Sequence, residues 1–193
     1  MIRLFPVEFS VSAAGCITVS LMVLVLPIPW LIAVFLAAAV HESFHLICLK
    51  LYRIPVYRIR IGIHGAVIET AALTPAQELL CAAAGPVGSL LCILWVRIFP
   101  MLALCGLLQG AYNLLPVYPL DGGRILYSAT GLLIPRYAGV VRKAISGCTV
   151  MFMILTCLIL FCKTCLPVFP VLGCYFLITA IHCRKTPCKG RQY

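Results

Sequence analysis

The sequence predicts an α-helical polytopic membrane protein with about six transmembrane helices and a short membrane-associated β-hairpin between the second and third. The 193-residue chain is 63% hydrophobic and only 10% charged, with a mean hydropathy of +1.11. A soluble domain carries about a quarter charged residues, so the composition excludes an ordinary soluble fold. Apolar runs of roughly 16 to 20 residues recur along nearly the whole chain, as expected for helices that cross a bilayer.

The apolar runs place the predicted spans at 9–26, 30–49, 79–97, 101–116, 147–162 and 166–182. The first run is followed by Pro27-Ile28-Pro29 and not by a small-residue cleavage site, so we interpret it as a retained span. No Ser/Gly-rich linker divides the chain. We therefore expect one membrane-embedded domain at 1–193, with a catalytic core at about 30–134 and accessory spans at 1–27 and 147–182.

The segment between the second and third spans has a different pattern. Arginines, then a glycine, alternate with isoleucines from Val56 to Ile63, and this period of two is typical of a strand. His64-Gly65 is a plausible turn, and residues 66–70 form a returning strand. The segment 56–70 is predicted to be the β-hairpin beside the membrane.

The basic residues predict the orientation. With the N-terminus in the cytosol, 13 of the 15 Lys and Arg residues fall on the cytosolic side, and the two others, Arg97 and Lys163, fall outside. This asymmetry follows the positive-inside rule and predicts a multi-pass cell-membrane protein with both termini in the cytosol. The net charge of +10 is spread between the spans, so it indicates no nucleic-acid partner.

His41-Glu42-Ser43-Phe44-His45 places two histidines four residues apart inside the second span. Side chains at that spacing share one helix face, about 6 Å apart, so both imidazoles can bind one metal ion. Glu42 is adjacent to the first ligand and can take a proton from a water molecule that zinc has acidified. The alternative is that the two histidines form hydrogen bonds between helices, with Glu42 as their partner. This alternative gives no function to the carboxylate inside the membrane.

A third ligand is expected, because catalytic zinc usually has three protein ligands and one open position. Asp121, the only aspartate in the chain, ends the segment that runs from Asn113 through two prolines. Counted from the outer ends of their spans, His41 and Asn113 lie at similar depths of about 18 and 20 Å. The alternative for Asp121 is the cap of a helix that begins at Gly122.

Together these motifs resemble the site-2 protease family of intramembrane zinc metalloproteases, peptidase family M50. The likeness is closest to the SpoIVFB-like six-span bacterial group, which includes a sporulation protease that cuts a sigma-factor precursor. It covers the second to fourth spans and rests on the His-Glu-x-x-His segment, on Gly85-Pro86 in a small-residue span, and on Asn113-x-x-Pro followed by Leu-Asp-Gly-Gly. The resemblance implies one Zn²⁺ per chain, held by His41, His45 and Asp121, with Glu42 as the catalytic general base.

The resemblance also implies roles for further residues. Asn113 would position substrate or stabilise the oxyanion, as amide side chains can. Supporting roles fall to four small or rigid residues: Pro116, Gly122, Gly85 and Pro86. Ser89 stands where an asparagine is common in the family, so no polar role is carried over to it. The hairpin resembles strands thought to receive unwound substrate by strand addition; a simple cytosolic cap for the bundle is equally open.

The expected function is intramembrane endoproteolysis of transmembrane or membrane-associated proteins, with a sigma-factor precursor or an anti-sigma factor as the substrate and sporulation as the setting. The expected partners are the bilayer, the substrate and a regulatory membrane protein. Two alternatives remain: a membrane metal transporter, which usually shows paired broken helices, and a non-catalytic membrane scaffold. A disulfide between Cys162 and Cys165 is left open, and the last two spans carry no chemistry that we can name.

Overall fold

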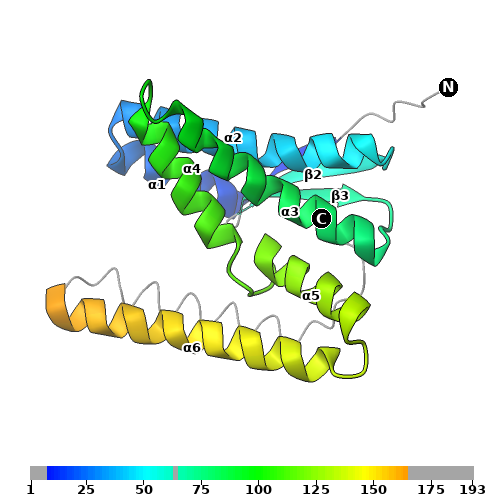
Figure 1. The fold of residues 1–193 in the computed structure, drawn as a ribbon. Helices are drawn as coiled ribbons and strands as arrows, with labels where there is room; N and C mark the ends of the chain where they lie inside the picture. Colours follow the sequence, from blue (N-terminus) through cyan, green and yellow to red (C-terminus); the bar gives the residue numbers. More distant parts are fainter. Residues whose placement is uncertain (1–7, 63–64, 165–193) are drawn as a thin grey trace. The chain divides into compact units, whose positions relative to one another are not determined.

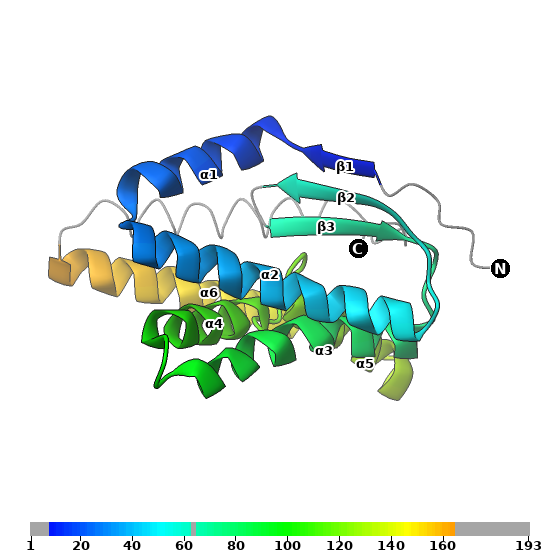
Figure 2. The same ribbon diagram turned by 90° about the horizontal axis from the view of Figure 1, so that it is seen from above.

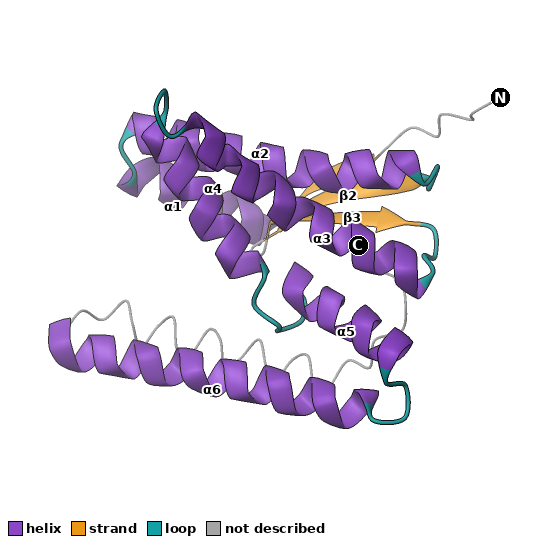
Figure 3. Ribbon diagram, in the orientation of Figure 1, coloured by secondary structure: helices purple, strands orange, loops and turns teal. Residues whose placement is uncertain are grey.

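The computed structural model describes residues 8–62 and 65–164, and the chain divides between Tyr112 and Asn113 into two compact units. The described elements are helical except for one small sheet (Figures 1 and 3). Those of the first unit are β1 (Glu8–Val11), α1 (Ala13–Val25), α2 (Ile28–Leu51), β2 (Val56–Gly62), β3 (Gly65–Thr70), α3 (Pro75–Leu91), the 3-10 helix η1 (Cys92–Trp95) and α4 (Pro100–Asn113). The second unit contains α5 (Asp121–Leu133) and α6 (Ala138–Thr164).

The predicted β-hairpin is confirmed. Strands β2 and β3 pair in antiparallel fashion, with Arg60 opposite Val67 and Ile61 opposite Ala66. A β-bulge lies between Val56 and Arg58. The predicted turn falls partly on residues 63–64, which lie outside the described residues. The alternation of arginine and isoleucine therefore did identify a strand.

The start of the first predicted span is wrong. Residues 8–11 form β1, which pairs in parallel with β2 to give a sheet in the order β1-β2-β3 (Figure 2). The Ser12 amide donates to the Ile61 carbonyl oxygen at 2.9 Å, and the Ser12 hydroxyl caps α1 by accepting from the Gly15 amide at 3.0 Å. The apolar pattern did not reveal β1, because its pairing partner lies about 50 residues further along the chain.

Ion pairs join the three strands on the exposed face of the sheet. The Arg58 Nε donates to a Glu8 carboxylate oxygen at 2.9 Å, and Arg60 lies 3.5 Å from Glu69. The hydrogen bond with Glu8, and the negative charges of Glu8 and Glu69, raise the pKa of Arg58 above its usual value. The arginines of the alternating segment are thus matched by acids on both neighbouring strands.

Helix α2 is central to the first unit. Its Leu49 packs with Ile68 of β3 and Cys81 of α3 in one apolar cluster, and its Ala37 packs with Cys92 and Leu102 in another. Both α3 and β3 therefore lie along α2 (Figures 1 and 2).

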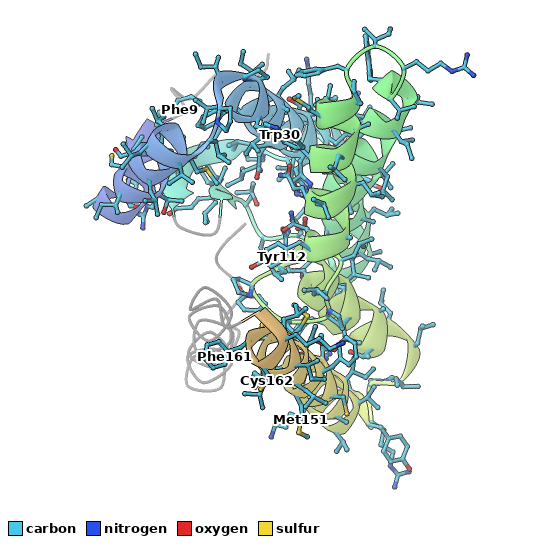
Figure 4. The ribbon with its side chains drawn as sticks, turned by 90° about the vertical axis from the view of Figure 1, so that its left-hand side faces the viewer. Phe9, Trp30, Tyr112, Met151, Phe161 and Cys162 are labelled. Carbon is cyan, nitrogen blue, oxygen red and sulfur yellow. The ribbon has the colours of Figure 1, made fainter. Side chains whose placement is uncertain are left out.

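In the second unit, Arg142 of α6 holds α6 against α5. Its Nε donates to the Thr130 hydroxyl at 2.7 Å, and its Nη2 donates to the Tyr127 carbonyl oxygen at 2.9 Å. The guanidinium carbon lies 3.8 Å from the centroid of the Tyr127 ring, a cation–π geometry. Apolar side chains of α6 such as Met151 and Phe161 are exposed (Figure 4), which suits contact with lipid.

Three described segments are long and apolar enough to cross a membrane: Ile28–Leu51, Pro75–Trp95 and Ala138–Lys163. They agree with the predicted spans at 30–49, 79–97 and 147–162. Helices α1 and α4 are shorter, with 13 and 14 residues. The predicted span at 166–182 and the residue Cys165 lie outside the described residues. The chain is thus a mostly helical membrane protein, while the six-span count, the cytosolic termini and the single domain stay predictions.

Candidate metal centre

The two histidines of the predicted motif lie on the buried face of α2. The buried residues of this helix recur every four positions from Ala33 through Ala37, His41 and His45 to Leu49. Helical spacing therefore brings both imidazoles to the side that packs against α3. Only 3% of His41 and 7% of His45 is exposed to solvent.

The two imidazoles converge through the same ring atom. The Nε2 atoms of His41 and His45 are 3.2 Å apart, and the rings meet edge to face with centroids 4.9 Å apart. Two nitrogens at this separation share one hydrogen bond, or both direct their lone pairs at a cation. The pair thus has the donor chemistry of a metal site.

The opposite ring nitrogens are held by α3. The His45 Nδ1 lies 2.8 Å from the carbonyl oxygen of Cys81, and the His41 Nδ1 lies 2.8 Å from the Ser89 hydroxyl. A carbonyl oxygen only accepts, so the His45 Nδ1 donates this hydrogen bond. Metal-binding histidines are typically anchored in this way by an outer hydrogen bond. Neither partner was predicted from the sequence, although Ser89 lies four residues after Gly85 and so shares its helix face.

Gly85 explains how α3 comes so close to the imidazoles. A side chain there would overlap the His45 Nε2, and its Cβ would lie 2.7 Å from the His41 Nε2. Gly88 similarly faces Phe44, whose Cγ would be 2.5 Å from an added Cβ. Pro86 between them is fully buried. The small-residue span is thus the surface on which the histidine pair of α2 packs.

Glu42 and Asn113 are each placed by a helix. Glu42 follows His41 on α2 and is partly exposed, in contrast to the buried imidazoles on either side of it in the motif. Asn113 is the last residue of α4 and is also partly exposed. Partial exposure leaves both polar groups accessible to a water molecule or a peptide.

Asp121 lies in the second unit as the first residue of α5. The N-cap of α5 is Leu120, which makes no side-chain cap, so the alternative in which Asp121 caps this helix is wrong. The carboxylate is buried, and its Oδ1 lies 3.3 Å from the Arg124 guanidinium. Carboxylate oxygens are common ligands of zinc, so this buried carboxylate is a candidate for a ligand.

The segment before Asp121 folds back on the start of α5. A Cβ at Gly122 would overlap the carbonyl group of Leu114 and lie 2.5 Å from the Leu115 oxygen, so only glycine fits there. The Pro116 carbonyl oxygen accepts a hydrogen bond of 2.5 Å from Ser146 of α6. Within the second unit, Pro116 and Gly122 therefore fix the backbone that presents Asp121.

The residues present suit a zinc ion. Two imidazole nitrogens with anchored rings and a buried carboxylate form the donor set of many catalytic zinc sites. Glu42, next to the first histidine, is partly exposed and is a carboxylate that can accept a proton. No soft or purely oxygen-rich ligand set competes with zinc among these residues.

Comparisons with known proteins agree with this chemistry. Residues 83–159 match the model of peptidase family M50. That stretch contains Gly85, Pro86, Asn113 and Asp121 and begins after the histidine pair. No curated protein matches the sequence.

A solved structure, the site-2 protease from Methanocaldococcus jannaschii, shares the fold with a TM-score of 0.59. The two sequences are 20% identical, and the match covers 93% of this chain and 91% of the other. Residues 83–159 are thus similar to peptidase family M50, and the chain shares the fold of a site-2 protease.

Proposed function

We propose that this protein is an intramembrane zinc metalloendopeptidase that cuts transmembrane or membrane-associated proteins. The observation that carries the proposal is the pair of Nε2 atoms of His41 and His45, 3.2 Å apart and buried in a helix apolar enough to span a bilayer. Two polar side chains inside a membrane are energetically unfavourable unless they bind a partner or serve a function. Binding a metal ion would give the two imidazoles a partner and a function.

Asp121 is the proposed third ligand. The proposal follows from the chemistry of the donors, because two imidazoles and one carboxylate are the ligands of many catalytic zinc sites. Arg124 contacts Oδ1 of the carboxylate, an outer contact of the kind that orients ligands. One Zn²⁺ per chain is the stoichiometry that this set would give.

Each of three residues of the chain has a separate proposed role in peptide hydrolysis. Bound zinc would supply Lewis acidity, which makes a water molecule nucleophilic at neutral pH. Glu42 takes a proton from the water molecule that attacks the peptide carbonyl, and passes this proton to the departing amine. Asn113 donates its amide hydrogen to the substrate or to the developing oxyanion. Gly85 keeps the space beside the imidazoles free of side-chain atoms.

The substrate must reach the site from the bilayer. A peptide bond in a helix is shielded by its hydrogen bonds, so the substrate has to unwind before Glu42 and Asn113 can act on it. Strand β3 is paired only on its β2 side among the described strands, which leaves an edge for an extended peptide. Following the sequence resemblance, the proposed substrate is a sigma-factor precursor or an anti-sigma factor, and the proposed relatives are the six-span enzymes of sporulation.

Removal of the metal tests this function. We expect a strong chelator to abolish cleavage by the purified protein in liposomes, and stoichiometric zinc to restore it. The His45→Ala variant should be inactive and should not be rescued by zinc, because one of the two imidazoles is gone. Cleavage is measured as the appearance of new termini in membrane proteins that are co-reconstituted with the enzyme.

Two results would refute the proposal. Cleavage that persists in the chelator and in His45→Ala would assign the activity to other groups. Zinc uptake into the liposomes without any cleavage would favour the metal transporter instead.

A further inference from the structure

Two cysteine side chains meet between α2 and α3. The Cys48 Sγ lies 3.2 Å from the Cys81 Sγ, although 33 positions separate the two residues in the chain. Neither sulfur is part of a disulfide, so both groups are thiols. A thiol is a weak donor and a weak acceptor, and the two groups can share an S–H···S contact at this distance. The fold therefore holds side by side the two groups that one disulfide bond needs.

The two sulfur-bearing residues differ in their exposure. Cys48 is partly exposed, whereas Cys81 is buried in the apolar cluster around Leu49 and Ile68. A small oxidant can therefore reach Cys48 first. Cys81 needs no access of its own to the oxidant, because its sulfur already lies against that of Cys48.

A bond between these sulfurs would close a loop around the β-hairpin. Cys48 lies in the last turn of α2, which ends at Leu51, and Cys81 lies in the second turn of α3, which begins at Pro75. The chain between the two cysteines contains β2 and β3. A disulfide here would join the two helices where the chain leaves for the hairpin and returns from it.

Closing the bond requires only a small movement. A disulfide S–S bond is about 2.05 Å long, so the sulfurs must approach each other by roughly 1.1 Å from their separation of 3.2 Å. Rotation of the two side chains about their Cα–Cβ bonds moves the sulfurs without moving the helices. The contact is thus close to the bonded geometry before any oxidation.

We propose that Cys48 and Cys81 are a peroxide-sensitive thiol pair, which oxidation converts into a disulfide that ties α2 to α3 at the base of the hairpin. The sequence alone gave no indication of this pair, because the close spacing in the chain drew attention to Cys162 and Cys165 instead.

The oxidation proceeds in two balanced steps. The Cys48 sulfur attacks one oxygen of hydrogen peroxide, the O–O bond breaks, and one water molecule leaves, so that Cys48 becomes a sulfenic acid. The Cys81 sulfur then attacks the Cys48 sulfur, the S–O bond breaks, and a second water molecule leaves with the proton of Cys81. The two thiols lose two electrons together, and the peroxide is reduced to two water molecules.

The thiol pair borders the candidate metal centre and is independent of it. The carbonyl oxygen of Cys81 accepts a hydrogen bond from the His45 Nδ1 at 2.8 Å, whereas the disulfide would form through the Cys81 side chain. The tests below measure neither zinc nor cleavage. Their outcome therefore leaves the proposed function untouched, and a failure of the proposed function leaves this inference standing.

The first test maps the disulfide in the full chain in detergent. The protein is treated with hydrogen peroxide, the remaining thiols are alkylated, and the digested peptides are identified by mass spectrometry. We expect a peptide pair that joins Cys48 to Cys81 and that a dithiol reductant separates. Oxidation should also raise the unfolding temperature by roughly 5–10 °C, because the bond closes a long loop in the unfolded chain.

The variants test the order of the two steps. In Cys81→Ser the sulfenic acid of Cys48 has no thiol beside it, so a cyclic diketone that traps sulfenic acids should label Cys48. In Cys48→Ser the buried Cys81 should stay reduced. Cys105→Ser is the matched control, since Cys105 is also a half-buried helical cysteine, and it should form the disulfide like the wild type.

Two results would overturn the inference. In the first, peroxide oxidises the exposed Cys16 of the wild type while Cys48 and Cys81 both remain alkylatable thiols. In the second, Cys48 forms a disulfide or a stable sulfenic acid in the wild type without Cys81, which would mean that the two sulfurs do not lie together as described. The mapping on the wild type decides the question even if a serine variant fails to fold.

Discussion

The Glu42→Gln variant is expected to retain its zinc while losing cleavage activity by roughly 100- to 10,000-fold, the usual contribution of a general base. Glutamine has nearly the shape of glutamate but cannot take a proton from water. The two imidazoles are buried and anchored to α3 by their own hydrogen bonds, so the metal ligands are expected to stay in place. The measurements are zinc content by mass spectrometry and cleavage of a co-reconstituted membrane substrate.

Glu8→Gln is the control for this experiment. Glu8 lies on β1, where it pairs with Arg58 at the surface of the sheet, and it should be dispensable for the chemistry. Cleavage by Glu42→Gln at the wild-type rate would remove Glu42 from the mechanism. A loss of both zinc and cleavage would instead make Glu42 a structural or ligating residue.

Replacing Gly85 with alanine is expected to reduce cleavage by a different route, the displacement of the metal ligands. The added methyl group would overlap the His45 Nε2 and lie 2.7 Å from the His41 Nε2, so one of the helices or both imidazoles must move. Overpacking of this kind costs about 1–3 kcal/mol. If the imidazoles move, that energy corresponds to a loss of zinc affinity of about 10- to 100-fold, and cleavage falls with it.

Gly139→Ala provides the matched control for Gly85→Ala. Nothing lies within 4 Å of a Cβ at Gly139 on α6, so this variant should bind zinc and cleave substrate like the wild type. Zinc affinity and thermal stability are measured for both variants. A Gly85→Ala protein with wild-type zinc affinity and cleavage would mean that α3 does not contact the imidazoles as described.

Local patterns in the sequence were sufficient to predict the histidine pair and the β-hairpin. Positions four apart on a helix share a face wherever the helix packs, so His41 and His45 could be paired without knowing their surroundings. The alternation of Arg58 and Arg60 with isoleucines is equally local, because strand periodicity is a property of a single segment. Both features appear in the structure as expected.

The sequence did not predict which residues far apart along the chain contact one another. The contact between His41 and Ser89 joins residues 48 positions apart and depends on how α3 slides along α2. The pairing of β1 with β2 has the same origin, and its apolar residues looked like the start of a helix. Gly85 was predicted to support the site, yet the sequence did not reveal that the imidazoles lie against it.

Zinc ligation by Asp121 is the most direct test of the account. We expect X-ray absorption at the zinc edge of the purified wild type to show imidazole nitrogens and a carboxylate oxygen at about 2.0–2.2 Å. Asp121→Asn should lose most of its zinc affinity and change this spectrum, while Glu69→Gln should do neither. An Asp121→Asn protein that binds zinc as tightly as the wild type, with the same spectrum, would contradict a single centre built from His41, His45 and Asp121.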